Sequence, residues 1–148
     1  MRKQKWILLI LLPVLTAAIL LLVFDQPFGY HRILNANWKW DLPAGYTERY
    51  GVSEAGFHGD GLRYHALAYR KGRADTINRM FFAAEPRTEM TDAAGKAGSW
   101  LKELDVPETE WPPFEACVCI SAKQADGSEG FLFWHPDTRT LYVIESFI

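Results

Sequence analysis

An uncharged apolar segment near the amino terminus is the feature that most constrains what this chain can fold into. Residues 7–24 contain no charged side chain and are dominated by Leu, Ile and Val. At about 1.5 Å of rise per residue, a helix of this length covers about 27 Å, which is close to the thickness of the hydrocarbon core of a bilayer. The segment therefore predicts a transmembrane helix.

Basic residues flank this segment mainly on its amino-terminal side. Arg2, Lys3 and Lys5 precede it and no acidic residue does. The positive-inside rule then places residues 1–6 in the cytoplasm and the carboxyl-terminal part of the chain outside the cell membrane. A cleaved signal peptide, which would release a secreted domain, is the alternative. The length of the apolar run, together with Asp25-Gln26-Pro27 in place of a small-x-small cleavage site, favours retention of the anchor.

The remainder of the chain has the composition of one small folded domain. Residues 25–148 carry 13 basic and 18 acidic side chains, and this net charge of −5 argues against a nucleic-acid partner. Aromatic residues make up 14 % of the chain, enough apolar surface to offset the entropy lost on folding. We expect residues 25–45 to be a tether that packs on the domain, and residues 46–148 to be the extracytoplasmic domain itself.

Hydrophobic periodicity predicts an α+β fold. Two helices are expected between the first two strands and the last three: one capped by Asp75 and ended by Pro86, the other capped by Thr91 or Asp92 and ended before Pro107. Turn residues such as Asp126-Gly127 separate the later strands. The expected architecture is an antiparallel sheet of about five strands with the two helices on one face, the strands being 48–56, 62–69, 116–123, 130–134 and 140–147.

The best candidates for a polar functional site are the turn His58-Gly59-Asp60-Gly61 and the later His135. If the strands align, His58, Asp60 and His135 would meet at one rim as a metal or acid/base site requires. A turn that needs only glycine backbone angles and an Asp bonded to the backbone explains the same residues. Nothing in the spacing requires a shared site, so the structural interpretation is preferred.

Cys117 and Cys119 are the only cysteines, and they lie two apart on a predicted strand. Their side chains then share a face, as a Cu(I) site or a redox pair requires. Cysteines two apart on an extended strand are near the limit of disulfide geometry, however, and no third sulfur, apart from scattered Met residues, completes a metal site. We expect both thiols to be packed in the core, and no cofactor is expected.

Two stretches of the sequence resemble a known group of proteins. Residues 56–61, with the sequence GFHGDG, and the run 130–142 resemble a group of small, uncharacterised bacterial proteins, mostly from Gram-positive species, whose members often have an amino-terminal hydrophobic anchor. The resemblance implies no activity, and it carries no functional residue over to this chain.

The function expected from the sequence is that of a single-pass membrane protein with a non-enzymatic extracytoplasmic domain. Its partners would be the membrane, through residues 7–24, and a protein or cell-wall component outside. One alternative is an envelope enzyme or metal-binding protein that uses His58, Asp60 and His135. A second alternative is a thiol or copper function at Cys117 and Cys119.

Overall fold

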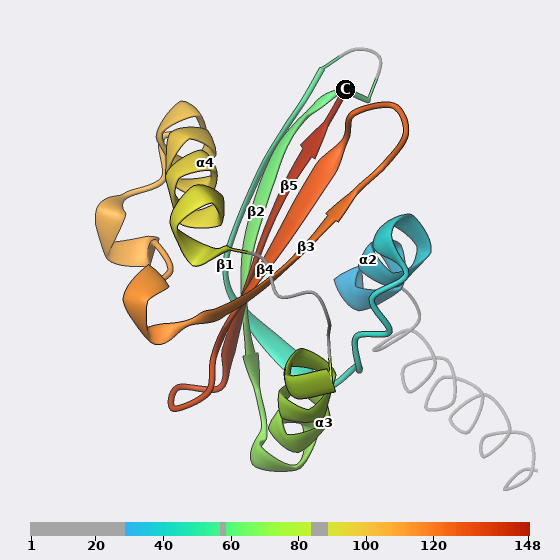
Figure 1. Cartoon of the computed structure of the whole chain (residues 1–148), viewed down its shortest axis with the longest axis vertical. Coiled ribbons are helices and arrows are strands. Elements are labelled where there is room, and N and C mark those ends of the chain that lie inside the picture. Colours follow the sequence, from blue (N-terminus) through green and yellow to red (C-terminus); the bar gives the residue numbers. More distant parts are fainter. Residues whose placement is uncertain (1–28, 57–58, 84–88) are drawn as a thin grey trace, which may run out of the picture.

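A computed structural model describes residues 29–56, 59–83 and 89–148 (Figure 1). Within these residues the fold is α+β, as predicted, with one antiparallel sheet in the order β1-β2-β5-β4-β3. Its strands are β1 (Tyr46–Ala55), β2 (Gly61–Tyr69), β3 (Val118–Lys123), β4 (Glu129–His135) and β5 (Thr140–Phe147). The helices are α2 (Tyr30–Trp38), α3 (Lys71–Ala83), α4 (Met90–Glu103) and the short 3-10 turns η1 (Glu108–Glu110) and η2 (Phe114–Ala116).

The described part of the chain contains no helix both long and apolar enough to cross a membrane. The predicted transmembrane segment, residues 7–24, lies outside the described residues.

Two predicted turns have the backbone conformations that their glycines suggest. Gly59 and Gly61 have φ values of 86° and 138°, which side chains rarely adopt. At the β3–β4 turn Gly127 has φ 97°, and the Asp126 carboxylate accepts a hydrogen bond of 2.8 Å from the Ser128 amide. The turn chemistry therefore fixes both hairpins at the positions predicted from the sequence.

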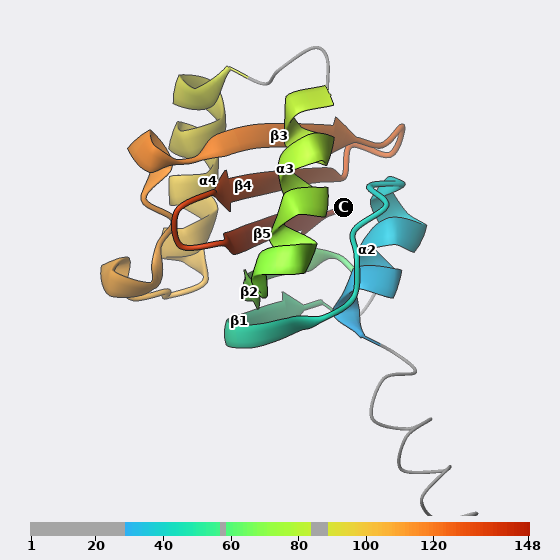
Figure 2. The same ribbon diagram turned by 90° about the horizontal axis from the view of Figure 1, so that it is seen from below.

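Both faces of the sheet are buried. In β4, Leu132 and Trp134 belong to one hydrophobic cluster while the alternating Phe131 and Phe133 belong to a second cluster. The first cluster includes side chains from α2 and α3, and the second includes side chains from α4. Figures 1 and 2 show the same layering, with α2 and α3 on one side of the sheet and α4 on the other.

The prediction that the two helices pack on one face is therefore wrong. Ile77 and Phe81 of α3 are buried in the first cluster, whereas Ala97 and Leu101 of α4 are buried in the second. The physical reason lies in the central strands, whose successive residues are apolar on both faces and so require a cover on each side.

Helix α3 begins earlier than predicted. Its first residue is Lys71, and the carbonyl of Arg70 accepts hydrogen bonds from the amides of Arg73 and Ala74. Asp75 consequently lies in the second turn rather than at the cap. Ala74 is buried and extends the apolar face of the helix by one turn.

Residues 30–42, within the predicted tether, form part of the hydrophobic core. The segment forms α2 and then turns at Lys39, which has a left-handed φ of 61°. The Asn35 side chain ties the turn back to the helix, because it accepts a hydrogen bond from the Leu42 amide (2.6 Å) and donates one to the Leu42 carbonyl (2.9 Å). The rings of Trp38 and Trp40 stack with their centroids 5.4 Å apart over the sheet.

Gly130 in β4 provides the space for these two tryptophans. A Cβ atom at this position would lie 2.7 Å from the Trp40 ring and 3.0 Å from the Trp38 ring. We expect Gly130→Ala to destabilise the protein by about 1–3 kcal/mol, because the rings must shift within a packed core. Gly95→Ala on α4 is the matched control: nothing lies within 4 Å, and exchange at a helical site should be neutral or stabilising. Denaturant midpoints of the two variants compare these effects, and equal midpoints would contradict the close approach.

Candidate functional site

The described residues of the predicted His58–Asp60–His135 constellation are not brought together. Next to Asp60, Gly61 is paired with Phe147 at the end of β5, whereas His135 is paired with Thr140 at its start. An eight-residue strand separates these ends by about 23 Å. His58 lies outside the described residues. Within residues 29–56, 59–83 and 89–148, no group of three or more His, Cys, Asp or Glu side chains is placed to hold a metal ion.

Cys117 and Cys119 are free thiols buried in the cluster beneath α4. Burial raises the pKa of each thiol from its usual 9 to about 12. The thiolate is the nucleophile and the metal ligand, so this environment opposes both redox and metal chemistry at neutral pH.

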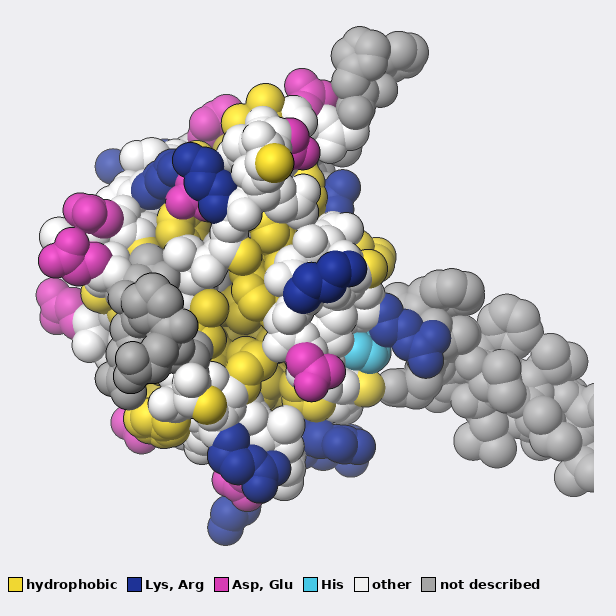
Figure 3. Space-filling model, turned by 45° about the vertical axis from the view of Figure 1, so that its right-hand side comes forward, with side chains coloured by type: hydrophobic (Ala, Val, Ile, Leu, Met, Phe, Trp, Pro, Cys, Tyr) yellow, Lys and Arg dark blue, Asp and Glu magenta, His cyan; other side chains and the backbone are white. Residues whose placement is uncertain are grey.

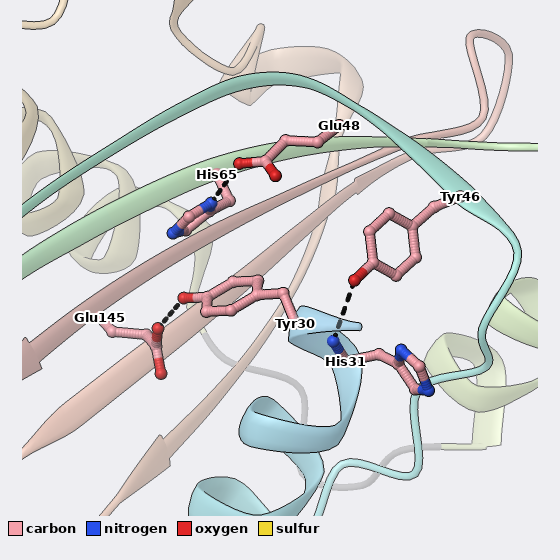
Figure 4. A network of polar contacts seen from close by, with 6 residues as sticks. All are labelled: Tyr30, His31, Tyr46, Glu48, His65 and Glu145. Carbon is pink, nitrogen blue, oxygen red and sulfur yellow. Dashed lines mark hydrogen bonds and ion pairs between the residues drawn. The ribbon is translucent and has the colours of Figure 1, made fainter. Parts of the chain in front are cut away.

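The most unusual polar group lies elsewhere, on the opposite face of the sheet. Glu145 in β5 has no exposed surface, and two side chains of α2 donate hydrogen bonds to its carboxylate. The Tyr30 hydroxyl bonds to Oε2, as Figure 4 shows, and the Trp38 indole nitrogen bonds to Oε1 at 2.5 Å. Each carboxylate oxygen therefore has a donor, which is the arrangement that makes a buried acid tolerable.

The amino end of α2 is held by a residue of β1. The Tyr46 hydroxyl accepts a hydrogen bond of 3.2 Å from the His31 amide, and Gly29 provides no side-chain cap (Figure 4). Because the first amides of a helix lack intrahelical partners, the tyrosine from the sheet replaces a conventional cap. Helix α2 is thus attached to β1 at its start and to β5 along its length.

Further polar side chains from β1 and β2 lie close to Tyr30. Its ring lies 3.9 Å from the His65 ring, centroid to centroid, and His65 Nδ1 lies 2.6 Å from a Glu48 carboxylate oxygen (Figure 4). The Arg63 guanidinium lies 4.7 Å from the centre of the Phe147 ring. Burial and the Glu145 charge both raise the pKa of Tyr30, so its hydroxyl remains a proton donor throughout the physiological range.

We term Glu145, Tyr30 and Trp38 the Glu145 clamp. Their hydrogen bonds attach helix α2 to the sheet. Both acceptor oxygens of the carboxylate are occupied by neutral donors from within the fold. His31, close to the clamp on α2, is nearly buried, and burial together with the Arg32 charge lowers its pKa. The geometry supports a fixed junction between α2 and the sheet better than it supports proton transfer to a substrate.

The sequence analysis did not identify the clamp, although the position of Glu145 in its strand indicates a buried acid. Glu145 alternates with Leu141 and Val143, so it stands on the apolar face of a predicted strand. A carboxylate at such a position requires a buried partner. Its partners could not be identified from the sequence, because they lie 107 and 115 residues away along the chain.

Comparison of the chain with protein-family models, with curated proteins and with solved structures finds no match.

Removal of the buried carboxylate tests the clamp. Glu145→Ala leaves the Tyr30 hydroxyl and the Trp38 indole without an acceptor, and each unsatisfied donor costs about 1–3 kcal/mol. We therefore expect a loss of about 2–6 kcal/mol in the free energy of unfolding, measured by denaturant titration. Glu48→Ala is the control, because Glu48 is 45 % exposed in its pair with His65 and its removal should cost less than about 1 kcal/mol. Similar losses in the two variants would contradict the clamp.

The cysteines give a second test, of chemical reactivity. A pKa of about 12 in place of 9 lowers the thiolate fraction near neutral pH about 1000-fold, since each pKa unit is a factor of ten. Alkylation by iodoacetamide should therefore be slow in the folded protein and fast in denaturant. It should accelerate as the pH rises above 9, where an unfolded thiol ionises first and the folded state loses stability. Rapid alkylation of the folded protein at neutral pH would show that the thiols are activated.

Proposed function

We propose that this chain is a single-pass membrane protein whose extracytoplasmic α+β domain has a non-enzymatic, envelope-associated role in binding a protein or cell-wall partner. Support for the anchor comes from the uncharged run at residues 7–24 and from the basic residues before it. Support for the non-enzymatic role comes from the clamp, whose polar atoms are satisfied by one another.

The observation that carries the proposal is the fixed attachment of α2 to the sheet. This helix begins at Tyr30, so residues 25–29 alone separate it from the apolar run. Five residues span at most about 18 Å when fully extended. A domain whose first helix is fixed to its sheet by Glu145 and Tyr46 would therefore stay close to the bilayer surface, with little freedom to move away from it.

Topology can be tested with reporters fused after Ile148. Alkaline phosphatase, which is active only outside the cytoplasm, should be active in the fusion, and a reporter that requires the cytoplasm should be silent. Removal of residues 7–24 should reverse both results and release the domain from the membrane fraction. An active cytoplasmic reporter on the full chain would contradict the proposed orientation.

Mass spectrometry of the membrane-bound product distinguishes the anchor from a cleaved signal peptide. Retention of residues 1–28 in the mature protein is the expected result. A product that lacks residues 1–24 and is found in the medium would instead support the secreted alternative.

A further inference from the structure

Charged side chains are distributed unequally between the two helical layers of the domain. The layer that contains α2 and α3, residues 29–45 and 70–83, carries six basic and two acidic residues. The layer on the other face, residues 89–116, carries two basic and seven acidic residues. The sheet thus separates a layer of net charge +4 from a layer of net charge −5, although the domain as a whole is acidic.

The basic layer also displays apolar side chains to solvent. Of the three large hydrophobic side chains that are exposed in the described part of the chain, Ile33 (45 %) lies on α2 and Phe82 (65 %) lies on α3. The edge strand β3 adds side chains that are only partly buried against the same cluster, namely Val118, Ile120 and Ala122. Figure 3 shows a strip of hydrophobic side chains on this side of the molecule, with Lys and Arg side chains to its right and below it.

Periodicity places the exposed residues of α3 on one stripe. Lys71, Asp75, Arg79 and Phe82 recur three or four residues apart and are all exposed, so they share a side of the helix that points away from the buried Ile77 and Phe81. Arg32 and Ile33 are exposed in the same way on α2. Basic side chains next to exposed apolar ones are typical of helices that lie in the interface of an anionic membrane.

We propose that the α2–α3 surface, defined by the exposed side chains of residues 29–45 and 70–83, docks on anionic phospholipid. This inference rests on the proposed function, since the predicted anchor ends a few residues before α2 and brings that surface to the bilayer. Charge complementarity selects the occupant: the +4 layer faces the lipid phosphates, and the −5 layer faces away from them. The acidic layer remains available to a partner outside.

Photo-crosslinking of the full chain in nanodiscs tests this docking. The photoreactive residue p-benzoylphenylalanine replaces Phe82 on α3 or, as the matched control, the exposed Ser99 on α4. The nanodiscs contain phosphatidylcholine alone or phosphatidylcholine mixed with phosphatidylglycerol. We expect lipid adducts, identified by mass spectrometry, at position 82 and not at position 99, with a higher yield when phosphatidylglycerol is present.

Charge reversal then tests whether electrostatic attraction holds the surface. Each basic residue near an anionic surface strengthens binding about fivefold, so Lys71→Glu combined with Arg79→Glu should lower the adduct yield at position 82 at least fivefold. Lys96→Glu combined with Lys102→Glu on α4 should leave the yield unchanged. Circular dichroism of both double variants verifies that they are folded.

The remaining outcomes distinguish failure of the docking from failure of the proposed anchor. Equal yields at positions 82 and 99, a yield independent of phosphatidylglycerol, or adducts to protein alone would overturn the docking while the chain still enters the nanodiscs. Failure of the full chain to enter nanodiscs of either composition would instead overturn the proposed function, because the apolar anchor does not depend on lipid charge.

Discussion

The buried carboxylate of Glu145 is the interaction on which the rest of this face of the structure depends. An ionisable group without solvent contact is costly unless each of its oxygens is hydrogen-bonded, and Tyr30 and Trp38 meet that requirement. Both donors are on α2, so satisfying the acid also fixes the helix. Once α2 is fixed, the Trp38 and Trp40 rings close over Gly130 and complete the core on that side of the sheet.

This arrangement connects the order of the sequence to the position of the domain. The helix that follows the apolar amino-terminal run is held to the sheet by polar contacts at Glu145 and at Tyr46. A flexible tether would leave the orientation of the domain free. A clamped helix would instead define which surface lies near the proposed anchor, and that surface is the one in which basic and exposed apolar side chains occur together.

Much of the fold was predictable from local pattern. The five strands and two of the helices occur where alternation, periodicity and turn residues indicate, and Gly59, Gly61 and Gly127 adopt the positive φ angles expected of them. The prediction that failed was the placement of both helices on one face of the sheet. Helical periodicity identifies which stripe of a helix is apolar, but not which face of a sheet will cover it. The uninterrupted apolar run Phe131–Trp134 contained the missing information, because alternate residues of a strand project to opposite faces.

The sequence by itself determined the apolar segment and its charge asymmetry, the strands and their hairpin turns, and the apolar stripes of α3 and α4, because each depends on residues close together in the chain. Only the tertiary structure decided that α2 belongs to the core, that helices cover both faces, and that Asp60 and His135 lie at opposite ends of β5. It also decided the partners of Glu145, since they are 107 and 115 residues away and meet it only when the sheet and the first helix pack together.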